Sequence, residues 1–233
     1  MSTPEEWYRN LPYVTRLYLT TAFATTLLTT FNVISPMMLY LDFHNIINRF
    51  HFWRLLSCFV FFGKFSLPFI MQMVILVQFF GSCERTYFTG LRGRAEFIFF
   101  MLCTIACVYL VHCTLVPIYF GGEVLIFAAM HYWCRREPTR LVNLYGFQIK
   151  AWYFPFVLLV LNMLLGANIV FGALGVLIGH LFWFLTEFVP IRYQRKVLQC
   201  PDALYSLIQN HTDVGAPPPP RFRQGQGYRL DAD

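Results

Sequence analysis

The sequence predicts an all-α, polytopic membrane protein with six transmembrane helices and an embedded first loop. Hydrophobic residues make up 57% of the 233 residues, charged residues only 13%, and the mean hydropathy is +0.51. A soluble domain of this length has too little interior to bury so much apolar side chain. The Lys and Arg residues gather at the edges of apolar runs, which is the pattern that sets membrane topology. That distribution argues against nucleic acid as the partner behind the net charge of +6.

The chain is expected to have three parts. Residues 1–16 form a cytosolic N-terminal interfacial helix, because a hydroxyl cap, a proline and two acids open it. Residues 17–190 form the membrane domain. Residues 191–233 form a cytosolic tail with a short surface helix over about 197–208, a stiff linker of four prolines at 217–220, and a final segment suited to binding a partner.

Apolar runs predict spans at about 17–34, 67–83, 97–116, 123–134, 151–165 and 168–189. The run at 123–134 is too short to face lipid over its whole length, so the other helices should surround it. Residues 35–66 are rich in aromatic side chains yet carry several charges and histidines. They are expected to form an embedded interfacial loop with short amphipathic helices.

The charge distribution predicts the orientation. With both termini on one side, 15 of the 18 Lys and Arg residues lie on that side, and the other three fall in the embedded loop. Positive charge concentrates on the cytosolic side of membrane proteins. Both termini are therefore expected in the cytosol.

No cofactor or metal is expected. The seven cysteines lack a C-x-x-C spacing and lie mostly inside apolar runs, so they are interpreted as packing thiols. His112 and His131 are expected at the membrane interface, near the ends of their spans.

The last span carries glycines at 172, 175 and 179. Small residues at this spacing let another helix approach closely, so Gly172, Gly175 and Gly179 are expected to form a packing face. His180 follows them near the middle of the span, where lipid makes an ionisable ring costly. A structural bond from His180 to a neighbouring helix is favoured over chemistry.

Short motifs along nearly the whole chain resemble the Derlin family, rhomboid-like pseudoproteases of the endoplasmic reticulum membrane. The motif W-Y-R-N-L-P-Y-V-T-R at 7–16 is similar to the family's opening, and I-S-P at 34–36 follows it. Trp53 and Arg54 match the W-R motif of the first loop, and G-R-A-E-F at 93–97 opens the third span. Leu198, Pro201, Leu204 and Tyr205 match the membrane-proximal tail.

The end of the tail resembles the family's SHP box, a ligand of the AAA ATPase valosin-containing protein. The residues of this binding tail are Phe222, Gly225, Gln226, Gly227, Tyr228, Arg229 and Leu230. Asp231 departs from the family, which often has Gly there, and residues 84–93 run differently from the Derlin pattern.

The resemblance implies a protein without proteolytic activity. A serine nucleophile needs a base within hydrogen-bond reach. The chain has no serine between Ser82 and Ser206, the rhomboid serine position falls on Glu123, and the base position falls on Gly172. His180 lies about 12 Å further along the helix and is out of register.

The function implied by the resemblance is assistance in moving misfolded proteins from the endoplasmic reticulum to the cytosol for degradation. Short spans should thin the bilayer, and a lateral opening lined by Gln72, Gln78, Glu123, Asn162 and His180 should admit a polar client segment. Trp53 and Arg54 should anchor the loop. Expected partners are the AAA ATPase, a membrane ubiquitin-ligase complex, misfolded clients, the lipid bilayer, and further copies or relatives of the chain in an oligomer. An intramembrane protease and a small membrane transporter are the alternatives.

Overall fold

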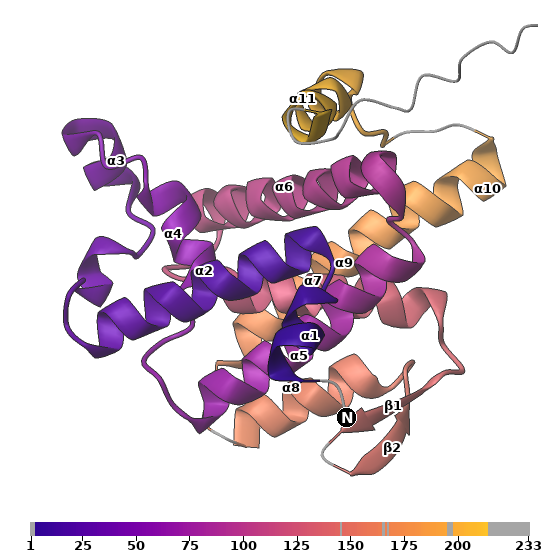
Figure 1. Ribbon diagram of the computed structural model, residues 1–233, viewed down its shortest axis with the longest axis horizontal. Helices are drawn as coiled ribbons and strands as arrows, with labels where there is room; N and C mark the ends of the chain where they lie inside the picture. Colours follow the sequence, from indigo (N-terminus) through magenta and orange to yellow (C-terminus); the bar gives the residue numbers. More distant parts are fainter. Residues whose placement is uncertain (1–2, 145, 165, 167, 195–197, 214–233) are drawn as a thin grey trace, which may run out of the picture.

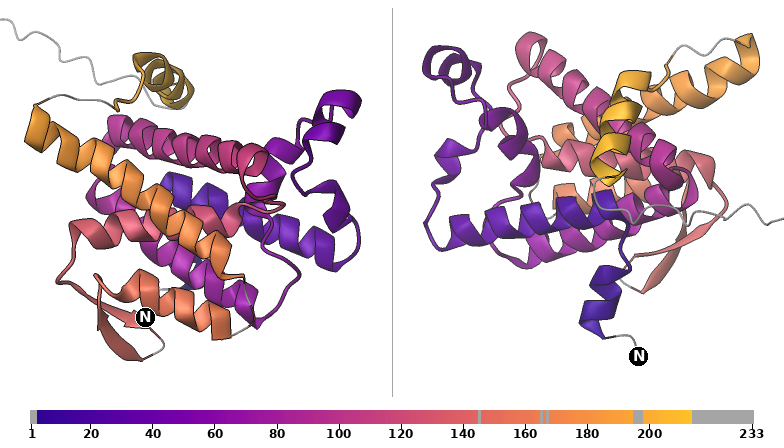
Figure 2. Two further views of the ribbon diagram at one scale, coloured as in Figure 1. Left: turned by 180° about the vertical axis from the view of Figure 1, so that it is seen from behind. Right: turned by 45° about the horizontal axis from the view of Figure 1, so that its top comes forward.

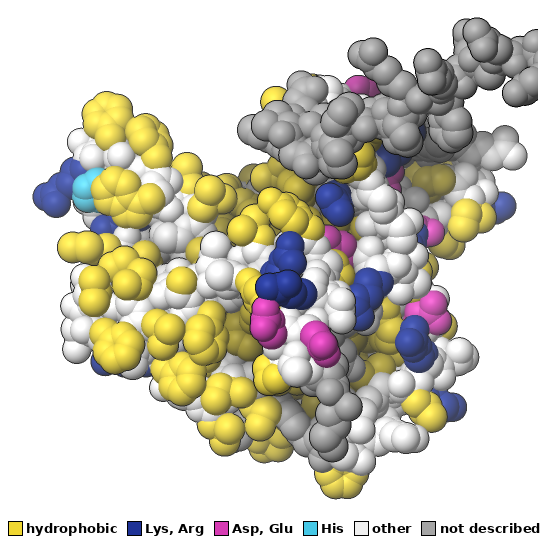
Figure 3. Space-filling view, in the orientation of Figure 1, with side chains coloured by type: hydrophobic (Ala, Val, Ile, Leu, Met, Phe, Trp, Pro, Cys, Tyr) yellow, Lys and Arg dark blue, Asp and Glu magenta, His cyan; other side chains and the backbone are white. Residues whose placement is uncertain are grey.

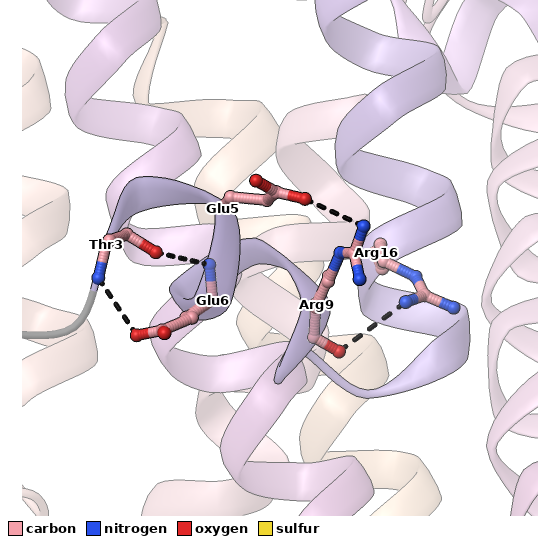
Figure 4. A network of polar contacts seen from close by, with 5 residues as sticks. All are labelled: Thr3, Glu5, Glu6, Arg9 and Arg16. Carbon is pink, nitrogen blue, oxygen red and sulfur yellow. Dashed lines mark hydrogen bonds and ion pairs between the residues drawn. The ribbon is translucent and has the colours of Figure 1, made fainter.

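The computed structural model describes residues 3–144, 146–164, 166, 168–194 and 198–213, with the backbone alone for 210–213. The chain begins with the short helix α1 (Pro4–Arg9), which has the predicted cap. The side chain of Thr3 accepts from the backbone of Glu6, while the carboxylate of Glu6 accepts from the backbone N–H of Thr3. Figure 4 shows this capping box beside the ion pair of Arg9 with Glu5, 2.7 Å long.

The longer helices form the body of the protein and pack together in one bundle (Figure 1). They are α2 (Tyr13–Thr30), α5 (Leu67–Thr86), α6 (Gly90–Thr114), α7 (Gly122–Arg136), α8 (Phe154–Leu164) and α9 (Ile169–Trp183). The helical course of α9 continues through a π-helix (Phe184–Phe188) into α10 (Val189–Tyr193). In the described residues, three helices are long and apolar enough to cross a membrane: α5, α6 and the continuous segment Ile169–Tyr193. The count of six spans stays a prediction.

Helix α7 lies in the centre of the bundle, as its short length predicts. All of its residues from Val124 to Cys134 are buried, and so is Gly122. Both views in Figure 2 show other helices around it, with α5 and α9 among them. These two helices make the most extensive helix contacts with α7. Because other helices enclose α7, its length does not have to match the thickness of the bilayer.

The predicted embedded loop lies at one end of the bundle, at the left of Figure 1. It contains a 3-10 turn (Pro36–Met38), α3 (Phe43–Arg49) and α4 (Arg54–Val60). The Asp42 carboxylate caps α3 by accepting from the backbone N–H groups of His44 and Asn45. Desolvation opposes ionisation of Asp42, but hydrogen bonds from Tyr40 and from those two residues together lower its pKa.

A β-hairpin between α7 and α8 was not predicted. The strands β1 (Leu141–Leu144) and β2 (Phe147–Lys150) pair antiparallel, with Leu144 opposite Phe147. The turn contains Gly146 at φ 98°, and the backbone N–H of Gly146 donates to the Asn143 side chain over 2.8 Å. An asparagine three residues before a glycine, between alternating apolar residues, is the sequence signal for this turn.

Glu84 provides the cap that the sequence of α2 lacks. Pro12 precedes α2 and has no side chain that could accept a hydrogen bond. The buried carboxylate of Glu84, near the end of α5, accepts instead from the backbone N–H groups of Val14 and Thr15 and from the Thr15 hydroxyl, at 2.9–3.0 Å. A carboxylate at a helix N-terminus also interacts favourably with the helix dipole.

Two helix boundaries differ from the predictions. Helix α6 starts at Gly90, seven residues before the predicted span, because the polar stretch before Phe97 is helical as well. The tail helix α11 is Asp202–Asp213 rather than 197–208 and packs against α6. The tail helix therefore begins directly after Pro201.

The outer surface is largely apolar. In Figure 3, hydrophobic side chains cover the end of the bundle near the embedded loop, whereas charged side chains gather toward the centre and the opposite end. Leu17, Phe23 and Leu28 are exposed on α2, and Leu110 and Leu115 at the end of α6. Large exposed apolar surfaces of this kind are expected where a protein faces lipid.

Candidate functional site

Two neighbouring cavities lie beneath the embedded loop. The larger has a volume of about 730 Å³ and lies between the loop, the start of α7 and the start of α9. The smaller, about 300 Å³, lies between α5, α7 and α8. Gln72 and Glu123 line both cavities, so they mark the place where the two meet.

Three of the predicted intramembrane polar residues come together there. The Asn162 side chain on α8 donates to Glu123 Oε1 over 3.3 Å. Gln72 projects from α5, and its Oε1 atom is buried without a hydrogen-bond partner in the described residues. Most of the remaining lining is apolar, with Phe61, Phe62 and Phe171 among it. The site is therefore a small group of polar side chains surrounded by hydrophobic ones.

Glycines at the start of α7 hold Glu123 against the loop. A Cβ atom on Gly121 would lie 2.3 Å from a ring carbon of Phe59, and one on Gly122 would lie 2.7 Å from the Phe59 carbonyl oxygen. The backbone N–H of Gly121 donates to the carbonyl of Cys58 over 3.0 Å. Only glycine permits this approach of α4 to the first turn of α7.

Tyrosine hydroxyls and Arg54 fix the loop in place. The hydroxyls of Tyr18 and Tyr109 donate to the carbonyls of Phe59 and Leu55 in α4. Arg54 is buried, donates to the carbonyl of Tyr40 over 3.1 Å, and lies over the Tyr40 ring at 4.8 Å. These bonds join α4 to α2, to α6 and to the preceding part of the loop.

Trp53 differs from Arg54. Its side chain is 55% exposed and stacks on the His51 ring with 4.5 Å between the ring centroids. The tryptophan thus lies on the outer surface of the loop, while the neighbouring arginine points inward.

The rhomboid base position is tightly packed by side chains of the neighbouring helices. A Cβ atom on Gly172 would lie 2.5 Å from Leu159 Cδ2 and 3.3 Å from the ring of Phe127. The position that would carry a histidine is therefore filled by α8 and α7. Glu123, at the predicted serine position, bonds to Asn162 instead.

The other two glycines lie where α9 meets α7. A Cβ atom on Gly175 would lie 2.5 Å from the carbonyl oxygen of Val124, and one on Gly179 would lie 2.4 Å from that of Ala128. The two helix backbones are thus in direct contact. The two contacts are four residues apart on each helix, at Gly175 and Gly179 on α9 and at Val124 and Ala128 on α7.

The structure places Gln78 and His180 away from this polar centre, and their part in a lateral opening stays a prediction. Gln78 lies six residues, or about 9 Å, further along α5 and lines neither cavity. His180 lines a separate small cavity with His131, and their Nδ1 and Nε2 atoms are 3.3 Å apart. This contact is the kind of bond to a neighbouring helix that was expected of His180.

His131 is buried within the bundle, and its depth at the membrane interface stays a prediction. Its side chain is only 5% exposed, because the surrounding helices cover the whole of α7. His112 is partly buried, and its Nδ1 accepts from the backbone N–H of Ile118 over 2.9 Å. The short length of α7 was the signal that histidines within it would be enclosed.

The predicted ATPase-binding residues, from Phe222 to Leu230, lie outside the described residues. Glu84 was the main structural residue that sequence reasoning missed, because its partners are 69 and 70 residues away in the chain. In the described part of the chain, no group of three or more His, Cys, Asp and Glu residues could hold a metal ion.

Comparison with known proteins gives one consistent family. The Der1-like family matches residues 11–202. Derlin-2.2 of Zea mays is 32% identical over 240 residues, with 98% of this chain and 95% of the relative covered. Derlin-1.1 of Zea mays is 28% identical, covering 89% and 86%, and Derlin-1 of Arabidopsis thaliana is 29% identical, covering 93% and 81%. The sequence motifs, the helical bundle and these matches agree that the chain belongs to the Der1-like family of Derlins, rhomboid-like membrane proteins.

Proposed function

We propose that this protein is a non-catalytic factor of the endoplasmic reticulum membrane that helps misfolded proteins pass into the cytosol for degradation. The observation that carries the proposal is the Oε1 atom of Gln72, which has no partner among the described residues and lies at the junction of two largely apolar cavities. A buried acceptor without a partner costs free energy, and a client segment can supply the missing donor through a backbone N–H.

The cavities suit a segment that is neither fully polar nor fully apolar. Aromatic walls bury apolar side chains, while Gln72, Glu123 and Asn162 offer acceptors and a donor to the polar groups of an extended chain. In lipid each unsatisfied backbone group costs several kcal/mol. A site with both kinds of group lowers the barrier for a client that enters from the side.

Short helices support the same proposal. The eleven residues of α8 extend about 16 Å, against a hydrocarbon thickness of about 30 Å. Phe156, Val160 and Leu164 on α8 are nevertheless exposed. A bilayer that adapts to so short an apolar surface becomes thinner beside the smaller cavity, which shortens the path of a client.

Serine proteolysis is a poorer explanation of the site. Leu159 and Phe127 fill the space at Gly172, where a histidine base would stand in a rhomboid protease, and Glu123 replaces the nucleophile. We therefore propose that the protein lacks the serine–histidine dyad and holds clients without cleaving them.

The C-terminal tail would recruit the ATPase that pulls the client out of the membrane. Residues 225–230 resemble an SHP box, and we propose that this segment binds the AAA ATPase valosin-containing protein, with Leu230 as an apolar anchor. A peptide of residues 221–233 should bind the N-terminal domain of that ATPase saturably, and Leu230→Ala should abolish binding. Full binding by the variant would refute this part. A ubiquitin-ligase complex and further Derlin subunits are the remaining proposed partners.

Photocrosslinking tests the client site directly. Benzoylphenylalanine at Tyr119, which lines the larger cavity, should crosslink to a misfolded client during its turnover. The same residue at Leu110, 65% exposed on α6 and lining neither cavity, is the matched control. Equal yields at both positions, or none at Tyr119, would contradict a client site in this cavity.

Gln72→Leu provides an independent test. It keeps the side-chain volume but removes the free acceptor, so it should slow client turnover while leaving the thermal stability unchanged or slightly higher. Normal turnover in a stable Gln72→Leu protein would show that the unpartnered oxygen has no part in client handling.

A further inference from the structure

A separate, smaller cavity lies at the other end of α7, away from the client site. It has a volume of about 120 Å³ and is lined by residues of α7, of the start of α8 and of α9. The lining residues are His131, Cys134, Arg135, Trp152, Pro155, Phe156 and His180. The volume corresponds to roughly four water molecules at about 30 Å³ each. It accepts a single compact group and is too small for a polypeptide.

Two indole rings hold Arg135 at this cavity. The Cζ atom of Arg135 is 4.5 Å from the ring centre of Trp152 and 4.3 Å from that of Trp183. The guanidinium plane therefore has aromatic faces near it from both α9 and the segment before α8. This fixes the position of the charge without neutralising it.

Two nitrogen atoms at the cavity lack hydrogen-bond partners in the part of the chain that the structure describes. In the described residues, the Nε atom of Arg135 and the Nδ1 atom of His131 are buried and have no hydrogen-bond partner. Only 5% of the surface of His131 is exposed. His180 adds a third nitrogen-bearing side chain, in contact with His131 at 3.3 Å.

Nearby carboxylates are engaged elsewhere. Glu137 accepts from the Tyr87 hydroxyl over 3.1 Å, and Glu187 forms an ion pair with Arg136. No described Asp or Glu lines the cavity or forms an ion pair with Arg135. One fixed cation, two histidines and no acid in a compact cavity match the requirements of an oxyanion.

We propose that this cavity binds a phosphate group, with Arg135 as the main donor and one N–H of the hydrogen-bonded pair His131 and His180 as a supporting donor. Trp152 and His180 are exposed on the outside of the bundle, which gives the group a way in from the surface. The cavity lies at the hairpin end of the bundle, where Lys and Arg gather and where Trp belts and basic pockets meet phospholipid headgroups. The phosphate can therefore come from a lipid of that leaflet or from free phosphate.

The test uses the full chain, stripped of lipid in maltoside micelles, and follows its thermal unfolding. Dioctanoyl phosphatidic acid, inorganic phosphate and dioctanoylglycerol are titrated separately. Phosphatidic acid should raise the unfolding midpoint saturably, because a ligand that binds only the folded state stabilises it. Dioctanoylglycerol, which has the same chains without the phosphate, should give no saturable rise.

Variants locate the site. Arg135→Gln should weaken binding by about tenfold or more, the effect of losing a charged donor. Arg140→Gln is the matched control, since Arg140 also lies over a tryptophan, Trp133 at 5.4 Å, but outside the cavity. It should change the affinity by less than about twofold, as expected for a distant surface charge. His180→Gln, at an exposed position, serves if Arg135→Gln fails to fold.

Comparison of the three titrations shows whether the phosphate group comes from a lipid or from free phosphate. A response to inorganic phosphate equal to that to phosphatidic acid would assign the site to free phosphate, whereas a response to phosphatidic acid alone would assign it to lipid. Equal responses to phosphatidic acid and dioctanoylglycerol would overturn the proposal, and so would unchanged binding in both Arg135→Gln and His180→Gln.

Discussion

Replacing Gly179 by alanine should destabilise the protein, although alanine is the better helix former. A Cβ atom at this position would lie 2.4 Å from the carbonyl oxygen of Ala128, 2.9 Å from its Cα and 3.0 Å from its carbonyl carbon. Ordinary contacts of a Cβ atom begin at 3.4 Å. All three neighbours are backbone atoms, so no side chain can rotate away and the helices themselves must separate.

The size of the effect follows from that separation. Helices α7 and α9 would have to move apart by about 1 Å, and a gap of roughly 0.5–1 Å already forfeits a quarter to a half of the dispersion energy of the affected contacts. Overpacking of this kind costs about 1–3 kcal/mol. The gain in helix propensity from glycine to alanine is about 1 kcal/mol, so packing decides the sign. The net loss should be up to about 2 kcal/mol.

Gly81→Ala is the matched control within the same bundle. Gly81 lies inside α5, and a Cβ atom there would meet nothing within 4 Å. Only the propensity term remains, so this variant should be more stable than the parent by about 0.5–1 kcal/mol. Thermal unfolding in mild detergent should therefore give midpoint shifts of opposite sign. A rise of the midpoint in both variants would refute the close approach of α7 and α9.

Three further changes test other parts of the fold. Glu84→Gln removes the charge that caps α2 and should lower the free energy of unfolding by about 1–3 kcal/mol, so an unchanged unfolding midpoint would contradict the role of Glu84. Tyr109→Phe removes the donor to the Leu55 carbonyl and should increase amide hydrogen exchange in α4, whereas α2 should exchange as before. The lowered pKa of Asp42 means that its cap on α3 holds above the unfolded-state pKa near 3.9 and is lost as the pH falls through the folded-state value. Protection of α3 should drop below about pH 4 in the parent, and Asp42→Asn should remove that pH dependence.

Local patterns were enough to predict the helices. The largely apolar run at 123–134 is too short to face lipid over its whole length, and the structure buries every residue from Val124 to Cys134. The mixture of aromatic and charged residues in 35–66 predicted short helices, and the structure contains α3 and α4 there, while the embedding of this loop in the membrane stays a prediction. Each of these inferences depends on properties of one continuous segment.

Contacts between distant segments were beyond sequence reasoning. Nothing near Glu84 indicates that its carboxylate caps a helix about 70 residues earlier, since the helix it belongs to is otherwise ordinary. Gln72, Glu123 and Asn162 were predicted as one group with Gln78 and His180, because polarity within a span was the only criterion. Which of the five share a cavity depends on the rotation of α5 and α9 about their axes. The glycine contacts with α7 fix that rotation for α9.

Helix α7 explains why the polar groups lie where they do. Polar side chains inside a membrane are costly unless protein surrounds them. The bundle covers α7 more completely than the other helices, so such groups cost least there, and both proposed sites use this helix. Glu123 in its first turn belongs to the proposed client site, while His131 and Arg135 near its end belong to the proposed phosphate site. Gly175 and Gly179 keep α9 in contact with the same helix between the two cavities. A change that separates α9 from α7 should therefore disturb both sites together, even though no residue lines both.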